Sequence, residues 1–159
     1  MPPFIFGGEM IRKVEKTSST WNELPYKFEP GTPPIAEAIA LTEAIKFIQS
    51  INLPEAHQHL QNIITYAREQ LLKRNCTILS PASSISIISF THKNIHPHDI
   101  AEIIGKNDVC IRAGHHCCMP LHSELKIPAS ARISLSYYNT TKDIDKLLHA
   151  FDDAIKIMK

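Results

Sequence analysis

Apolar residues recur every three or four positions in four segments of the chain, and this spacing predicts four helices. The segments cover residues 34–52, 54–75, 97–105 and 140–155. Proline stands in the first turn of three of them, where its missing N–H group costs nothing. The predicted stripes contain Ile35, Ala38, Ile39, Thr42, Ile45 and Ile48; Leu60, Ile63, Ile64, Ala67, Leu71 and Leu72; Ile100, Ile103 and Ile104; and Ile144, Leu147, Leu148, Phe151 and Ile155.

Between the second and fourth helices the apolar period changes from helical spacing to alternation, which is typical of β-strands. Strands are predicted at residues 77–79 and 85–90, separated by a turn, and at residues 109–111 and 132–137. Together these elements predict an α/β fold, an α+β sandwich with an antiparallel or mixed sheet and helices packed on one of its sides.

The first 33 residues give no periodic signal. Gly7-Gly8, Pro25 and Pro30 interrupt any regular element, and Gly31 begins a glycine- and proline-rich turn. We therefore expect residues 1–33 to be an irregular segment that packs on something outside it, and residues 34–159 to form one domain.

Composition and charge narrow the range of functions. Of the 159 residues, 43% are hydrophobic and 21% are charged, which is typical of a globular protein. The formal net charge of +1 argues against nucleic-acid binding, and no apolar run is long enough to cross a membrane. The start of the chain lacks the pattern of a secretory signal, so the four cysteines point to the reducing cytoplasm.

The segment from Arg112 to Pro120 carries the strongest chemical signal. Two histidines, His115 and His116, directly precede Cys117, and Arg112 lies five positions before it. A thiol reacts as its thiolate, which nearby cations favour, and reactive groups are commonly placed in loops of this kind. Cys117 is therefore the candidate nucleophile, with Arg112, His115 and His116 as supporting residues.

Two other interpretations of the cysteines stay open. A zinc site is disfavoured, because ligands adjacent in sequence cannot easily converge on one tetrahedral ion, and we assign no metal ligands. An inert, buried thiol is expected for cysteines in strands, and we expect Cys76 and Cys110 to be of this kind.

Two further residues are candidates for binding. Arg132 lies in an alternating strand, where a half-buried guanidinium normally has an anionic partner; this partner is either a substrate carboxylate or a structural carboxylate. Thr32, in its glycine- and proline-rich turn, could offer a hydroxyl and a backbone amide to a phosphate.

Taken in order, the motifs resemble the C-terminal part of the SufS-like cysteine desulfurases, which are fold-type I pyridoxal-phosphate enzymes of the aminotransferase class V family. The most specific block is Arg112-Ala113-Gly114-His115-His116-Cys117. The supporting matches are Pro2-Pro3-Phe4, Gly7-Gly8-Glu9-Met10-Ile11, Phe28-Glu29-Pro30-Gly31-Thr32-Pro33, His96-Pro97-His98-Asp99-Ile100, Ala131-Arg132-Ile133-Ser134 and Tyr138-Asn139-Thr140.

The resemblance implies a role for each candidate residue. Cys117 would take sulfur from L-cysteine and carry it as a persulfide, leaving L-alanine, and the sulfur would pass to an acceptor protein for iron–sulfur cluster assembly. Arg132 would hold the substrate carboxylate. Thr32 would reach the phosphate of the pyridoxal phosphate of the other subunit, because the complete enzymes are homodimers.

The resemblance also implies that much of such an enzyme is missing. The Schiff-base lysine belongs to a Ser-x-His-Lys-type motif in the large domain, and this motif does not occur in the sequence. We therefore expect a C-terminal piece that is inactive alone and needs a complementary N-terminal chain or a full-length desulfurase. A non-enzymatic sulfur-relay or regulatory module, or a truncated gene product, is the alternative. Cys118 stands where the family usually has alanine, and it could accept sulfur or fill space.

Overall fold

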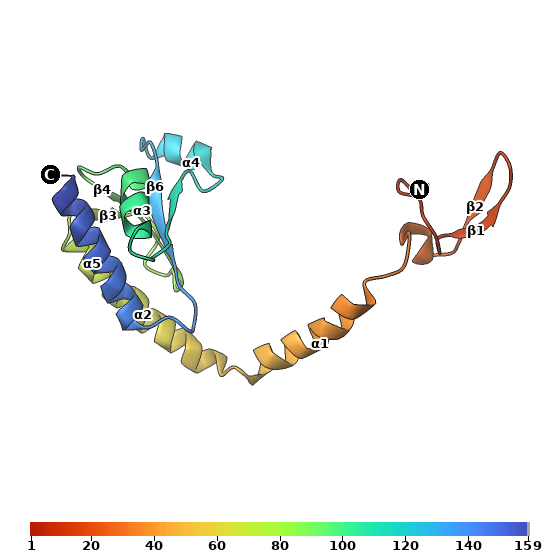
Figure 1. The fold of residues 1–159 in the computed structure, drawn as a ribbon, viewed down its shortest axis with the longest axis horizontal. Coiled ribbons are helices and arrows are strands. Elements are labelled where there is room, and N and C mark those ends of the chain that lie inside the picture. Colours follow the sequence, from red (N-terminus) through yellow and green to blue (C-terminus); the bar gives the residue numbers. More distant parts are fainter. Residues whose placement is uncertain (159) are drawn as a thin grey trace. The chain divides into compact units, whose positions relative to one another are not determined.

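The computed structural model describes residues 1–158, and the chain divides into two compact units, Met1–Ile51 and the part from Asn52 onward (Figure 1). We call them unit 1 and unit 2 and describe each by itself. The division lies one helix later than the predicted boundary after residue 33, because helix α1 (Ile35–Ser50) belongs to unit 1 and buries none of its residues. The expected packing of residues 1–33 on another domain stays a prediction.

Unit 1 contains regular structure where we predicted none. Strands β1 (Ile11–Val14) and β2 (Ser19–Trp21) pair antiparallel in a hairpin, and a short 3₁₀ helix, η1, spans Tyr26–Phe28. Met10 is fully buried, and its sulfur accepts a hydrogen bond from the N–H group of Gly7. The rings of Phe6 and Trp21 lie 5.2 Å apart, centre to centre. The prediction that residues 1–33 are irregular throughout is therefore wrong for the hairpin.

Unit 2 is built on a four-stranded antiparallel sheet with the strand order β3-β4-β6-β5. One face of the two central strands is buried, with Ile88 and Phe90 of β4 beside Ile133 and Ala131 of β6. Successive side chains of a strand point to opposite faces, so Ser89 and Arg132 lie on the other face. The strands are β3 (Cys76–Ile78), β4 (Ile87–His92), β5 (Arg112–Gly114) and β6 (Ser130–Ser134).

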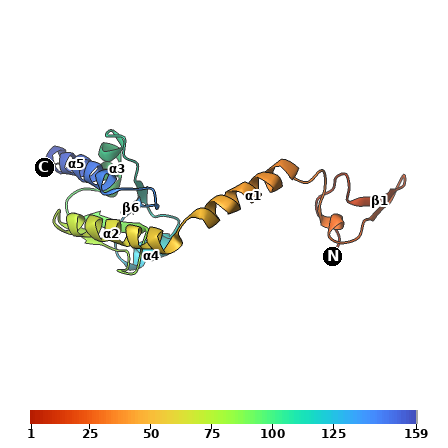
Figure 2. The same ribbon diagram turned by 90° about the horizontal axis from the view of Figure 1, so that it is seen from below.

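Three helices contribute to the core of unit 2, and α3 and α5 lie side by side (Figures 1 and 2). Residues of these helices pack in one hydrophobic cluster with the buried face of the sheet, which confirms the α/β class with helices on one side. The helices of unit 2 are α2 (Leu53–Leu72), α3 (Pro97–Gly105), α4 (Met119–Glu124) and α5 (Thr141–Ile157).

The predicted strands at 109–111 and 132–137 are displaced in the structure. Strand β5 starts at Arg112, because Asp108 turns the backbone with a φ of 55° and the residues before Arg112 are outside the ladder. Strand β6 ends at Ser134, because the backbone then turns, with the N–H group of Asn139 bonded to the carbonyl of Ser136. The short helix α4 was not predicted.

Within residues 1–158, none of the helices is both long enough and apolar enough to cross a membrane.

Candidate functional site

The candidate nucleophile Cys117 stands at the exposed tip of a tight turn between β5 and α4. The N–H group of Cys118 donates to the carbonyl of His115 at 2.9 Å and closes the turn. The two central residues, His116 and Cys117, have φ angles of 52° and 63°. Positive φ at both central positions is the mark of a type I′ turn, which favours glycine, asparagine and aspartate. The turn therefore stores backbone strain beside the thiol.

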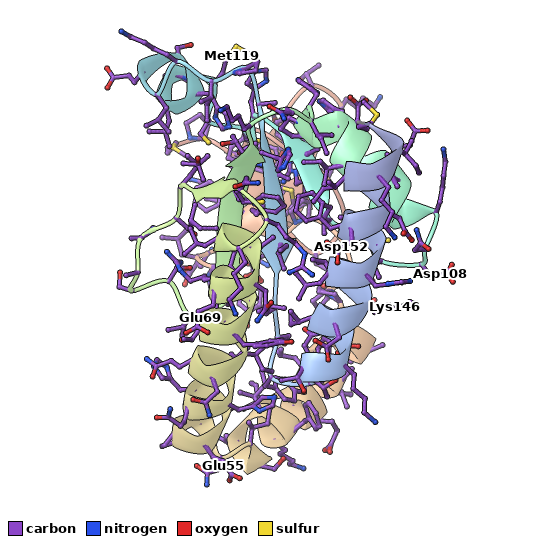
Figure 3. The ribbon with its side chains drawn as sticks, turned by 90° about the vertical axis from the view of Figure 1, so that its left-hand side faces the viewer. Glu55, Glu69, Asp108, Met119, Lys146 and Asp152 are labelled. Atoms are coloured by element: carbon purple, nitrogen blue, oxygen red, sulfur yellow. The ribbon has the colours of Figure 1, made fainter. Side chains whose placement is uncertain are left out.

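The turn lies at one end of unit 2. Met119, the first residue of α4, lies at the opposite end of this unit from Glu55 in the first turn of α2 (Figure 3). The helix is short, and its backbone contacts continue back to the turn, since the N–H group of His122 donates to the carbonyl of Cys118 at 3.3 Å. The turn and α4 thus form one local structure after β5, which we call the cysteine loop (residues 115–125).

Two guanidinium groups lie near the cysteine loop. An N–H group of Arg112 donates to the sulfur of Cys117 across 3.6 Å. Arg112 is also the direct cross-strand partner of Arg132 in the β5–β6 register. Like charges opposite each other destabilise a sheet unless something compensates them, so this pair favours an anion on the open face.

Arg132 itself has an unsatisfied group. Its Nε atom is buried and has no hydrogen-bond partner, and none of the ion pairs within residues 1–158 includes this side chain. Buried polar atoms are nearly always paired in folded proteins. Arg132 therefore forms no ion pair with a structural carboxylate within residues 1–158, which was one of its two expected partners. Its role in holding a substrate carboxylate stays a prediction.

Burial lowers the pKa of the His116 imidazole, which favours its neutral form. The hydrogen bond to Ser130 raises this pKa by a smaller amount, and the nearby Arg132, Arg112 and His122 lower it further. Its Nε2 atom lies 3.0 Å from the carbonyl oxygen of Ser130. His115 is exposed, and its ring packs edge-on against that of His122 at 5.4 Å. Of the three predicted supporting residues, Arg112 contacts the sulfur of Cys117, whereas the rings of His115 and His116 contact His122 and Ser130.

Sequence reasoning missed His122 and Ser130. Both are buried, at 4% and 1% exposure, and they are the two buried polar residues found within residues 1–158. The ring of His122 lies 3.2 Å from the carbonyl of Cys118 and 3.0 Å from the hydroxyl of Ser130. The four-residue spacing between Cys118 and His122, just after the cysteine pair, was the available signal.

The other cysteines differ from Cys117. The thiol of Cys118 is half-buried and donates to the carbonyl of His115 at 3.0 Å. Cys76 is buried, as predicted, and burial raises the pKa of its thiol to about 12. Cys110 is exposed, so its predicted burial is wrong; it precedes β5 and contributes nothing to the core. No group of three or more possible metal ligands comes together in the part of the chain that the structure describes.

Alkylation in the native state should separate these thiols. At about pH 8 Cys117 is expected to react with iodoacetamide, whereas Cys76 stays protected, since its thiolate becomes populated only near a pH of about 12. The exposed Cys110 serves as the internal reference. Peptide mass spectrometry at several reaction times measures the rates. Reaction of Cys117 no faster than that of Cys76 would contradict the assignment of an activated thiol.

Thr32 lies in unit 1 and is exposed, so it is described apart from the other five candidates. It lines a cavity of about 490 Å³ together with Glu9 and Glu29. The two carboxyl groups are the charged side chains of that lining, which leaves no cation there to bind a phosphate. The predicted phosphate contact of Thr32 therefore depends on groups from elsewhere.

The residues of this chain do not by themselves fit pyridoxal phosphate. The cavity at Thr32 is acidic, and three cavities of unit 2, of about 250, 370 and 460 Å³, are lined by neither Cys117 nor Arg132. A cofactor of this size is normally bound in a concave site that encloses most of it. Within residues 1–158 the chain presents a thiol and cations, and none of these four cavities lies beside them.

Comparison with known families and proteins agrees with these features. Residues 1–147 match the family described as "Aminotransferase class-V". A "Probable cysteine desulfurase" of Halobacterium salinarum is 41% identical over 160 residues, which cover 99% of this chain and 39% of that protein. One of Staphylococcus epidermidis is 44% identical over 153 residues, covering 94% and 37%. The chain thus spans less than two fifths of the length of these relatives.

Solved structures show the same fold. The cysteine desulfurase CsdA of Escherichia coli, in its S-sulfonic acid form, is 29% identical, with a TM-score of 0.84 over 100% of this chain and 40% of that one. An apo cysteine desulfurase of Thermococcus onnurineus is also 29% identical, with a TM-score of 0.81 over 97% and 39%.

Proposed function

The chain belongs to the aminotransferase class-V family, and from this we propose that it is the sulfur-accepting portion of a SufS-like cysteine desulfurase. The reaction would convert L-cysteine to L-alanine and transfer the sulfur to Cys117 as a persulfide, for iron–sulfur cluster assembly in the cytoplasm. The observation that supports this most directly is the exposed Cys117 sulfur beside the guanidinium of Arg112. A cation at this distance favours the thiolate, which is the nucleophilic form.

The thiolate has a defined chemical task. It attacks a sulfur atom of a donor, a new S–S bond forms, and the bond between that sulfur and the donor breaks, its electron pair leaving with the donor. The same step runs with an inorganic polysulfide, which releases a shorter polysulfide anion. Before the transfer the negative charge lies on the Cys117 sulfur, and after the transfer it lies on the persulfide. The guanidinium of Arg112 would stabilise the charge in both states.

The other candidate residues would bind the substrate or the cofactor, or support the thiol of Cys117. Arg132 would hold the carboxylate of L-cysteine through its guanidinium fork, which agrees with its unpaired Nε atom. Arg112, His115 and His116 support the thiol, and Thr32 would contact the phosphate of the pyridoxal phosphate of the partner subunit in the homodimer. When bound, pyridoxal phosphate supplies the electron sink for cleavage of the carbon–sulfur bond.

The 159 residues alone are proposed to be inactive as a desulfurase. The sequence lacks the lysine motif, and the four cavities described above in residues 1–158 are lined by neither Cys117 nor Arg132. A complementary N-terminal chain or a full-length desulfurase would have to supply the lysine and the cofactor site. Helix α1 offers a surface for such a partner, since it buries none of its residues. Its exposed apolar side chains are Ile35, Ile39, Leu41, Ile45, Phe47 and Ile48.

A test compares the chain alone with a completed enzyme. With pyridoxal phosphate and L-cysteine, the chain alone is expected to release no more sulfide than free cofactor does, because it has no site that holds the cofactor. The chain mixed with the N-terminal part of the Staphylococcus epidermidis relative is expected to release alanine and to form a persulfide on Cys117. Sulfide and alanine assays measure the outcome. Sustained turnover by the chain alone would contradict the proposal.

A non-enzymatic sulfur relay is the second candidate, because the exposed thiol of Cys117 is accessible to a sulfur donor from solution. Persulfide formation on Cys117 from polysulfide, together with no turnover in the completed enzyme, would favour the relay. An acceptor protein would then take the sulfur in either case.

A further inference from the structure

The strained backbone conformation of the turn that carries Cys117 needs support from neighbouring groups. Its two central residues, His116 and Cys117, have positive φ angles. Residues other than glycine, asparagine and aspartate rarely adopt such angles. Such residues are strained, so the conformation persists only where its surroundings fix it. The groups that fix this turn therefore determine where the thiol lies.

Those groups converge on Ser130, the first residue of β6. Its carbonyl oxygen can only accept, so the Nε2 atom of His116 donates to it. The carbonyl of Cys118 likewise can only accept, so the Nδ1 atom of His122 donates to it. This leaves the Nε2 atom of His122 as the acceptor for the hydroxyl of Ser130, at 3.0 Å. The side chain of the central residue His116 is thus bonded to β6, and the carbonyl of Cys118, which closes the turn, is bonded to α4.

This placement links the thiol to the arginine pair. Ser130 and Arg132 are two positions apart on one strand and therefore lie on the same face of the sheet, opposite Gly114 and Arg112 of β5. Through Ser130, the buried His122 fixes the turn relative to the strand that carries Arg132, the cross-strand partner of Arg112. Neither His122 nor Ser130 contacts the sulfur of Cys117.

We propose that buried His122, with Ser130, is a positioning residue of the Cys117 thiol: it holds the strained turn so that the sulfur stays within reach of Arg112. The inference rests on the proposed function for its purpose. The charged and titratable groups on the turn and on the elements beside it are Arg112 of β5, Arg132 of β6, His98 of α3, which lies next to Gly114, and His115, His116, Cys118 and His122 of the cysteine loop.

The test measures alkylation of Cys117 with iodoacetamide in the full chain, across the pH range in which thiols ionise, with Cys110 as the internal reference. His122→Leu is expected to slow Cys117 about tenfold near neutral pH and to move the midpoint of its pH profile upward, because the relaxed turn takes the sulfur away from Arg112. His122→Asn, whose amide can still donate to the carbonyl of Cys118, should recover most of the rate.

Two controls keep the result interpretable. His149→Leu, at a side chain 78% exposed on α5, should change neither the rate nor the midpoint. Ser130→Ala removes the hydroxyl and keeps the carbonyl, and it should shift the pH profile of Cys117 alkylation in the same direction by a smaller amount. Circular dichroism shows whether each variant folds. If His122→Leu does not fold, Ser130→Ala tests the positioning role.

An unchanged midpoint for Cys117 in a folded His122→Leu or Ser130→Ala chain would overturn the inference, as would an equal slowing of Cys110. Alkylation requires no sulfur transfer. A shifted profile in a chain that forms no persulfide would therefore support the positioning role and contradict the proposed function, so the two can fail separately.

Discussion

Replacing Cys117 with serine is expected to abolish persulfide formation at this site and to lower sulfur transfer in the completed enzyme by about a thousandfold or more. The hydroxyl of serine does not ionise near neutral pH, so the guanidinium of Arg112 would face a neutral group in place of a thiolate. The chain is incubated with inorganic polysulfide, its thiols and persulfides are capped by alkylation, and the peptide that contains residue 117 is weighed by mass spectrometry.

Cys110→Ser is the matched control, because Cys110 is also exposed but lies before β5 and away from the turn. That variant should keep the full persulfide signal on Cys117. Equal persulfide loads on Cys117 and Cys110 in the unaltered chain would show that exposure alone decides the modification, and the assignment of Cys117 as the sulfur carrier would then be wrong.

Replacing Phe151 with alanine is expected to destabilise unit 2 by about 3–5 kcal/mol, which is a large part of the roughly 5–15 kcal/mol that stabilises a typical domain. The ring of Phe151 is fully buried in the middle of α5 and packs edge-on against Phe90 of β4, with 5.9 Å between ring centres. Truncation leaves a cavity at the junction of helix and sheet. The measurement is urea unfolding followed by pulsed alkylation of Cys76, which is buried in the same core and reacts only when unit 2 opens.

Ile157→Ala, on the same helix but 68% exposed, should change the free energy of unfolding by less than about 0.5 kcal/mol. A cost below about 1 kcal/mol for Phe151→Ala would mean that α5 is not packed on the sheet as described.

The helices of unit 2 could be predicted because their apolar stripes are set by local spacing. In the second predicted helix, Ile63, Ile64, Ala67 and Leu71 are buried as expected, while Leu72 at the end of the stripe is exposed. The start of α5 was also predictable from its side chains. The backbone N–H group of Thr140 donates to the carboxylate of Asp143 at 2.8 Å, and this bond is the main cause of the lowered pKa of Asp143.

What could not be predicted depends on contacts between distant residues. The start of β5 at Arg112 is decided by pairing with β6, which local alternation does not report. Helix α4 is only six residues long and begins beside a proline, so it has too little sequence for a periodic signal. For α1 the apolar pattern predicted the helix correctly, but none of its residues is buried in unit 1. The pattern therefore does not tell what the apolar side chains pack against.

The candidate site divides in the same way. Cys117 and its neighbours could be identified because the reactive residues are adjacent in sequence. The cross-strand pairing of Arg112 with Arg132, and the bond that joins His122 to Ser130, bring together residues 20 and 8 positions apart through the sheet. These contacts need the register of β5 and β6, which only the folded chain supplies.

The tilted ring pair of Phe6 and Trp21 provides a fluorescent probe of unit 1. Trp21 is the one tryptophan of the sequence, and it belongs to unit 1. Selective excitation of its indole therefore gives an emission signal from the hairpin region, free of contributions from unit 2. Comparing this fluorescence with the pulsed labelling of Cys76 would reveal in a single titration whether the two units melt together or one after the other.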